Sequence, residues 1–209
     1  MVVTREGTRE GEPAPRPRRA DARRNVDALI EAARTVFATS GVDAPAKEIT
    51  DLAGVGVGTL YRHFPQRSDL VKAVVESGID AVADAGPALS AAYEPAEALT
   101  QWISRFTELL ATKRGLASAL HSGDPAFSGL PAYFRRRLGP TLAALLDAAV
   151  ADGTVRDDIS AEDLLDALTQ LSSPVPGRGP EHNQRVVAVF VDGLRSGRHD
   201  GSVRKKKIL

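Results

Sequence analysis

The fold of this chain is decided by residues 53–64, which read AGVGVGTLYRHF. A short helix is expected from near Pro45 to Gly54, and a second from Gly56 to Phe64, just before a proline that ends it. A short turn that contains glycine sets two helices at a steep angle, which is the arrangement of a helix-turn-helix. The stretch therefore predicts this motif, with the start of its second helix projecting outward.

A longer amphipathic helix is expected upstream of this motif. Its apolar residues recur at helical spacing from Val26 to Phe37. Asp21 can act as its N-cap, and Gly41 can end it in the left-handed conformation. The three helices would share one core, which we expect to contain Leu29, Ala33, Phe37, Ile49, Leu52, Ala53, Val55 and Leu60.

The residues that this packing leaves on the outside are suited to DNA. Val57 and Thr59 carry methyl groups that can meet thymine methyls, and Gly58 lets the backbone approach closely. Polar side chains around them can hydrogen-bond to phosphates or base edges. The predicted DNA contacts are Lys47, Val57, Gly58, Thr59, Tyr61, His63 and Arg67.

Residues 53–64 closely resemble the DNA-binding domain of the TetR family of transcriptional regulators. Residues 30–42, which read IEAARTVFATSGV, resemble the first helix and turn of the same domain. The resemblance covers about residues 25–75 and depends most on the Thr-Leu-Tyr-x-His-Phe core. Two features depart from the family pattern. Gly56 stands where serine or threonine is common, and residues 44–46 lack the hydroxyl groups often found there.

The resemblance implies a homodimeric, one-component regulator, usually a repressor, whose three N-terminal helices bind a palindromic operator. It also implies that the larger C-terminal part binds a small effector and forms the dimer through its last two long helices. Effector binding would then release the operator. By position, the family's base and phosphate contacts fall on the seven residues named above. An activator remains an alternative within the family.

The remainder of the chain is also expected to be helical, because it is rich in alanine and has little strand-like alternation. A long helix is expected to begin at Gln66 or Ser68, with apolar positions from Leu70 to Ile79. Further helices are expected over residues 95–111, 130–152, 160–171 and around 186–194, with a Pro/Gly loop at 174–180. The fold class is therefore all-α, with about nine helices. The predicted organisation is a disordered basic arm at 1–20, a helix-turn-helix domain at 21–66, a helical effector-binding and dimerisation domain at 67–196, and a disordered basic tail at 197–209.

Half of the ten aromatic residues of the chain lie between positions 102 and 134. They are candidates for an apolar ligand pocket between helices, with a few polar groups to orient the ligand. Ordinary core packing is the alternative for each of them. The candidate pocket residues are Trp102, Phe106, His121, Phe127, Tyr133 and Phe134, and the candidate dimer residues on the last two helices are Leu164, Leu168, Val187, Phe190, Val191 and Leu194.

The charge balance is neutral, with 27 basic and 27 acidic residues among 209, whereas nucleic-acid binders usually carry a basic excess. The charges are unevenly distributed, however. Residues 1–72 carry 12 basic and 10 acidic side chains, residues 73–191 carry 9 and 15, and residues 192–209 carry 6 and 2. Operator affinity would therefore rest more on individually placed contacts than on bulk charge.

Other classes of protein find little support in the sequence. There is no cysteine, and the four histidines lack metal-ligand spacing, so we expect neither a metal nor a cofactor. The glycine run at 54–58 lacks the residues that complete a nucleotide-binding loop, and Tyr61 and His63 lack a carboxylate that would make them a catalytic pair. No apolar run is long enough to span a membrane, and we expect a cytoplasmic protein. The alternatives are a helical ligand-binding or enzyme domain without a DNA role, and an adaptor that binds a partner protein.

Overall fold

The structure is a computed structural model that describes residues 16–112, 116–120 and 122–195. Within these residues every regular element is a helix, so the predicted all-α class is confirmed. The elements are α1 (Arg16–Thr39), α2 (Ala46–Ala53), α3 (Val57–His63), α4 (Arg67–Ala92), α5 (Pro95–Thr112), α6 (Ala117–Leu120), the 3-10 helix η2 (Pro125–Phe127), α7 (Leu130–Ala151), α8 (Ala161–Leu171) and α9 (Pro180–Arg195). Residues 1–15 of the expected arm and the expected tail at 197–209 lie outside the described residues.

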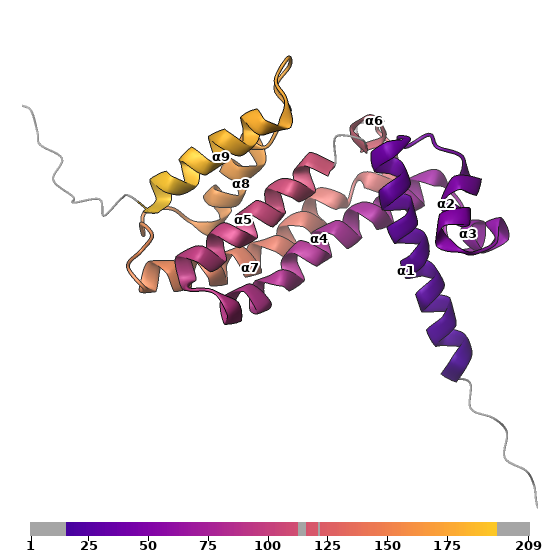
Figure 1. Cartoon of the computed structure of the whole chain (residues 1–209), viewed down its shortest axis with the longest axis horizontal. Helices are drawn as coiled ribbons and strands as arrows, with labels where there is room; N and C mark the ends of the chain where they lie inside the picture. The colour runs from indigo at the N-terminus through magenta and orange to yellow at the C-terminus, as the bar shows by residue number, and fades with distance from the viewer. Residues whose placement is uncertain (1–15, 113–115, 121, 196–209) are drawn as a thin grey trace, which may run out of the picture.

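The helices form two parts: a head, made of α1, α2, α3 and the start of α4, and a body, made of the rest of α4 and α5 to α9. Figure 1 shows α1, α2 and α3 together at one end of an elongated molecule, and α8 and α9 toward the other end. The long helix α4 belongs to both parts, because it packs against α1 in the head and against α5 and α7 in the body. A capping box fixes its start, where the backbone N–H of Gln66 donates to the carboxylate of Asp69 at 3.0 Å.

The first helix begins earlier than the sequence indicated. It starts at Arg16, so Asp21 lies inside it and is not its N-cap. Residues 16–20, which were expected to belong to a disordered arm, are therefore helical. Pro17 does not prevent this start, because proline is tolerated in a first helical turn, where its missing N–H has no partner to lose. The other end is as expected: α1 stops at Thr39, and Gly41 has a φ of 83°.

The helix-turn-helix is present at the predicted place. Gly54 ends α2 in the left-handed conformation, with a φ of 67°, and its N–H turns back to the carbonyl of Asp51. Ile49 and Leu60 are buried in the same apolar core as the inner residues of α1, as expected. Leu52 was expected in this core, but it is 57% exposed. The inner face of the short helix α2 carries Ile49, Thr50 and Ala53, and Leu52 lies off that face.

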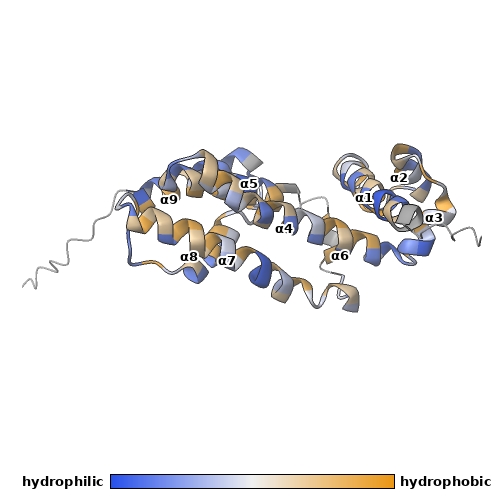
Figure 2. Cartoon of the chain, turned by 90° about the horizontal axis from the view of Figure 1, so that it is seen from below, coloured by the Kyte–Doolittle hydropathy of each residue, from blue (hydrophilic) through white to orange (hydrophobic). Residues whose placement is uncertain are grey.

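The body has a dense core between α4, α5, α7 and α8. Trp102 and Phe106 are fully buried there and stack with their ring centroids 5.7 Å apart. The indole N–H of Trp102 donates to the carbonyl of Val82 at 2.9 Å, which joins α5 to α4. Helices α4 and α7 approach closely at Gly86, where any Cβ would collide with the methyl group of Thr141. In Figure 2 these helices carry both hydrophobic and hydrophilic residues, as amphipathic helices around a core do.

None of the described helices is both long and apolar enough to cross a membrane.

Candidate nucleic-acid interface and ligand cavity

The outer face of α3 is largely exposed to solvent. Val57 and Tyr61 are 40% and 54% exposed, although both are large apolar or aromatic residues. Gly58 is also exposed, and a Cβ at this position would meet nothing within 4 Å. Positions 57, 58 and 61 share one side of a helix, because they are three and four residues apart. The head therefore presents a small apolar and glycine-containing surface at which a groove of DNA could approach closely.

Two of the predicted contacts sit at the edge of this surface. Thr59 and His63 are half-buried, because they lie nearer to the core residue Leu60. Arg62 is exposed on the outer face, four residues after Gly58, but the sequence reasoning did not select it. Its spacing from Gly58 was the signal that could have found it. The outer face of α3 therefore includes a cation suited to phosphate.

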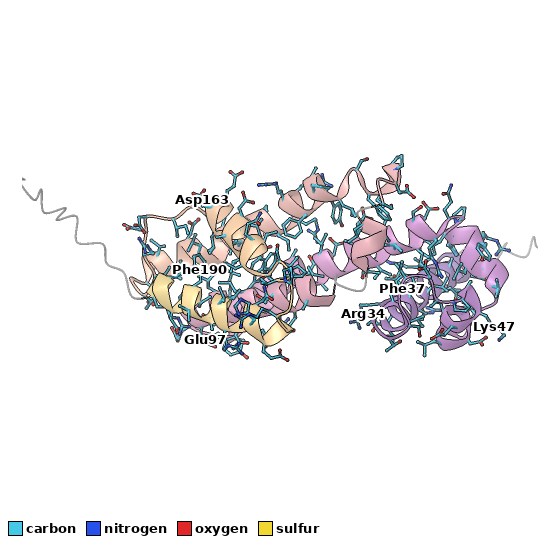
Figure 3. The ribbon with its side chains drawn as sticks, turned by 90° about the horizontal axis from the view of Figure 1, so that it is seen from above. Arg34, Phe37, Lys47, Glu97, Asp163 and Phe190 are labelled. Carbon is cyan, nitrogen blue, oxygen red and sulfur yellow. The ribbon has the colours of Figure 1, made fainter. Side chains whose placement is uncertain are left out.

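Lys47 extends from the first turn of α2 into solvent. Its side chain is 75% exposed, and its Nζ lies 2.6 Å from the carboxylate of Asp51 one turn later. Exposed pairs of this kind contribute little to stability, so a phosphate can compete with Asp51 for the ammonium group. Figure 3 shows Lys47 at the outer end of the head, far from Phe190 and Glu97 in the body.

Arg67 differs from its expected role as a phosphate contact. Its guanidinium donates to the backbone carbonyl of Ala44, just before α2, and lies 5.4 Å from the centroid of the Phe37 ring. The side chain is half-buried. Arg67 therefore fastens the start of α4 to the loop between α1 and α2, which makes it a residue that positions the head.

A cavity of about 470 Å³ lies in the body. Its walls come from α4, α5, α6, η2, α7 and the end of α8. Two candidate pocket residues, Phe127 and Phe134, line it. The described lining is Val75, Ile79, Leu110, Leu120, Phe127, Leu130, Pro131, Phe134, Thr169, Ser172, Ser173 and Pro174. The cavity is within the usual size range of small-molecule sites, about 300–1,000 Å³, and its walls are mostly apolar.

The other candidate pocket residues lie elsewhere. Trp102 and Phe106 belong to the solid core, one layer behind Phe134, and do not line this cavity. The hydroxyl of Tyr133 donates to the carboxylate of Asp80 at 2.7 Å, and burial together with this bond raises the pKa of Tyr133. His121 lies outside the described residues. Aromatic composition alone could not separate core residues from cavity residues.

A second cavity, of about 450 Å³, separates the head from the body. The head contributes the loop after α1 and the start of α4, including Arg67, and the body contributes residues of α6 and η2. Phe127 lines this cavity as well as the one in the body. It is held by the short helix η2, whose N-cap Asp124 accepts the N–H of Ala126 at 2.8 Å. The side chain of Phe127 therefore lies between the ligand cavity and the cavity that Arg67 lines at the head.

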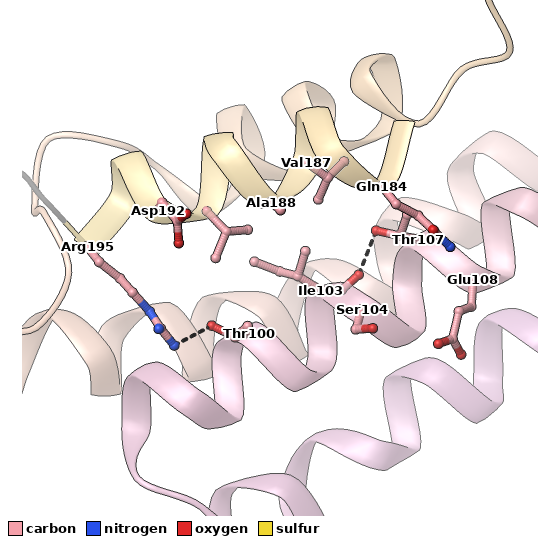
Figure 4. Close-up of a pocket in the computed structure, with 11 residues that line it drawn as sticks. Thr100, Ile103, Ser104, Thr107, Glu108, Gln184, Val187, Ala188, Asp192 and Arg195 are labelled. Carbon is pink, nitrogen blue, oxygen red and sulfur yellow. Dashed lines mark hydrogen bonds between the residues drawn. The ribbon is translucent and has the colours of Figure 1, made fainter. Parts of the chain in front are cut away.

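A third hollow is a groove of about 320 Å³ between α5 and α9 (Figure 4). Several of its polar groups already have partners. The hydroxyl of Thr107 donates to the carbonyl of Ile103 at 2.8 Å, and the guanidinium of Arg195 reaches Thr100 at 2.8 Å and Glu97 at 3.3 Å. The groove therefore offers a ligand few hydrogen-bonding groups at these positions, because they are already used within the protein.

Most of the candidate dimer residues are buried in the core of the subunit. Leu164, Leu168, Val187, Val191 and Leu194 are each at most 7% exposed, so they cannot provide the surface of an interface, and the expected assignment has to be corrected. Helix α9 has a second apolar stripe on another side. It comprises Val186, Val189, Phe190 and Gly193, of which Val189 is 73% exposed. Of the expected residues only Phe190, which is half-buried, belongs to this outer stripe.

The comparisons with known proteins agree with this arrangement. Residues 29–74 match the family described as bacterial regulatory proteins, tetR family, and residues 94–196 match the C-terminal domain described as transcriptional regulator SbtR-like. A TetR transcriptional regulator of Streptomyces coelicolor, SCO0520, is 36% identical, with a TM-score of 0.68 over 81% of this chain and 98% of that one. A TetR regulatory protein of Mycobacterium vanbaalenii is 37% identical, with a TM-score of 0.67 over 86% and 99% of the two chains.

Curated relatives match over a shorter stretch of the chain. An HTH-type transcriptional regulator of Staphylococcus aureus is 38% identical over 63 residues, which is 30% of this chain and 34% of the relative. The match thus spans about a third of the length of these relatives. The similarity to the two solved structures, in contrast, extends over head and body together.

Proposed function

The chain belongs to the TetR family and is a DNA-binding transcriptional regulator, and we propose that it is a cytoplasmic repressor that a small-molecule effector releases from a palindromic operator. Regulators of this family are not enzymes. The observation that carries the proposal is the exposed outer face of α3, together with two cavities, one in the body and one next to the head, that share Phe127 as a lining residue.

The DNA contacts that we propose follow from the exposure of α3. Val57 and Tyr61 would meet base edges and thymine methyl groups, and Gly58 would let the helix enter the major groove closely. Lys47 and Arg62 would bind phosphates on either side. Thr59 and His63 would contribute from the rim of this surface.

A homodimer is part of the proposal, because a palindromic site needs two heads. The outer stripe of α9, with Val186, Val189, Phe190 and Gly193, supports it. These residues recur every three or four positions, and Val189 and Gly193 are exposed while Val186 and Phe190 are only partly buried, as expected for a helix that packs against a second copy. Glycine at 193 would allow the two backbones to come close.

The effector would act through the cavity in the body. A ligand that binds better when Phe127 is displaced would change the contacts of η2 with the head, and so the position of α3. A hundredfold loss of operator affinity requires about 2.7 kcal/mol of differential binding, within the usual range for coupling between two sites.

The test uses the full chain and a DNA site recovered with it. Tyr61→Ala and Thr59→Ala should abolish operator binding in a gel-shift assay while size-exclusion chromatography shows an unchanged oligomer. Tyr93→Ala is the matched control, because Tyr93 is 47% exposed at the far end of α4. Undiminished DNA affinity in Tyr61→Ala would refute the role of α3.

A further inference from the structure

The body cavity contains one polar group that the protein leaves without a partner. Ser172, just after α8, is 5% exposed, and among the described residues its Oγ has no hydrogen-bond partner. A buried hydroxyl without a partner costs stability, typically about 1–3 kcal/mol. Ser172 lines the cavity, but its Oγ is almost inaccessible as placed, so a molecule inside the cavity could complete the missing hydrogen bond once rotation about χ1 turns the hydroxyl toward it.

The neighbouring hydroxyls are already satisfied. The hydroxyl of Thr169 donates to the carbonyl of Leu165 at 2.7 Å, and that of Ser173 donates to the carbonyl of Thr169 at 3.1 Å. Both residues line the same cavity as Ser172. The unsatisfied hydrogen-bonding capacity is therefore concentrated at a single point of the described wall.

The described wall of the cavity carries no ionisable side chain. The nearest arginines of α7 are paired on its outside: Arg137 with Asp80 and Asp84 at 2.5 Å and 2.8 Å, and Arg135 with Asp166 at 3.2 Å. A charged ligand would therefore lose its hydration without gaining a counter-charge, which is costly in an apolar site.

From these observations we infer that the effector is an uncharged, mainly apolar molecule with one hydrogen-bonding group that meets Ser172. The two phenylalanines of the wall, Phe127 and Phe134, favour a ligand with an aromatic or other flat ring. The inference rests on the proposed function, because it concerns the ligand of the same cavity. It can nevertheless be tested without DNA.

The test compares two fluorescent probes that share one ring skeleton. N-phenyl-1-naphthylamine is neutral and carries one N–H, whereas 1-anilinonaphthalene-8-sulfonate is the same molecule with a sulfonate added. Fluorescence titration of the full chain should show the neutral probe binding at least about tenfold more tightly, because the sulfonate meets no cation among the described residues of the wall. Equal affinity, tighter binding of the sulfonate, or no binding of the neutral probe would overturn the inference.

Variants then locate the bound probe. Ser172→Ala should weaken binding of the neutral probe about two- to tenfold, the range of one neutral hydrogen bond, whereas Ser173→Ala should not. Removing an unpartnered hydroxyl should leave the melting temperature unchanged or higher, so weaker binding cannot be ascribed to unfolding. Equal effects of the two alanine variants would contradict the assignment of Ser172.

A last pair of variants fills the cavity with a larger side chain. Leu110→Trp should abolish binding of the neutral probe, and Leu110→Phe should weaken it, so one variant suffices if the other fails to fold, as circular dichroism would show. Retained affinity in a folded Leu110 variant would place the probe elsewhere and refute the inference. If the chain binds the neutral probe as predicted but binds no DNA, only the proposed function is refuted. If it binds DNA but prefers the sulfonate probe, only the inference about the ligand is refuted.

Discussion

The guanidinium of Arg67 donates a hydrogen bond to the backbone carbonyl of Ala44. Arg67 is the first residue of α4, and Ala44 lies just before α2, so this bond joins the helix that runs into the body to the motif that carries α3. The ring of Phe37 beneath the guanidinium adds a cation–π contact. The head therefore has a specific attachment to α4 in addition to its apolar core.

Arg67→Ala should lower the free energy of unfolding by about 1 kcal/mol, because it removes this hydrogen bond and the interaction with Phe37. Operator affinity should fall as well, since α2 loses its support, but the slope of log affinity against log salt should not change. Urea unfolding and fluorescence anisotropy at several salt concentrations measure the two effects.

Arg62→Ala is the matched arginine variant on the outer face of α3. Its stability should stay within about 0.5 kcal/mol of wild type, because the side chain is exposed. Its salt slope should decrease by about one for each DNA phosphate that the variant no longer neutralises. If Arg67→Ala changed the salt slope in the same way, Arg67 would bind a phosphate, as the sequence alone suggested.

Phe127→Ala should uncouple ligand from DNA. A neutral compound that releases the wild-type protein from its operator should still bind the variant, but the release factor should fall toward one from the roughly 5–150-fold usual for coupled sites. Phe134→Ala is the control, because Phe134 lines the ligand cavity but not the cavity at the head, so it should weaken ligand binding without abolishing release at saturation. If ligand-saturated Phe127→Ala protein still released the operator fully, Phe127 would not couple the ligand cavity to the DNA-binding head.

Val189→Arg should convert the proposed dimer into folded monomers, because it puts a charge into the outer stripe of α9. Gln184→Arg should remain dimeric, since Gln184 faces the groove beside α5. Val187→Arg should instead unfold or aggregate, because Val187 is only 6% exposed within the subunit. Sedimentation velocity with circular dichroism separates these outcomes, and a dimeric Val189→Arg protein would show that the interface lies elsewhere.

Tyr133→Phe should reduce the free energy of unfolding by about 1 kcal/mol through the loss of the hydrogen bond to Asp80, which is partly exposed. It should leave the affinity for N-phenyl-1-naphthylamine unchanged, because the hydroxyl points to α4 and not into the cavity. Urea unfolding and a probe titration test both statements. A large loss of probe affinity would show that Tyr133 contacts the ligand, as the sequence analysis predicted.

The helices could be predicted because their signals are local. Gly41 and Gly54 end helices in the left-handed conformation, and Ser160 accepts the N–H of Asp163 at the start of α8, where a helix was expected. The start of α1 was missed because Asp21 is a favourable N-cap residue, whereas in the structure it lies inside the helix and pairs with Arg24.

The sites were less predictable, because burial depends on which side of a helix finds a partner. Helix α9 has apolar residues on two sides, and periodicity cannot tell that Val187 packs inward while Val189 faces out. The unsatisfied hydroxyl of Ser172 likewise has no sequence signature, since Ser173 beside it is the same residue with its bond already made. Such distinctions arise only when the chain is packed.

The most direct test of the central claim is selection of bound DNA from a random pool with the full-length protein. If two copies of α3 read the operator, the enriched sequences should form an inverted repeat whose half-sites are about 10 base pairs apart, or a multiple of that spacing. Tyr61→Ala should recover no such repeat under the same conditions. Enrichment of a single site without two-fold symmetry, or of the same repeat by Tyr61→Ala, would contradict the account.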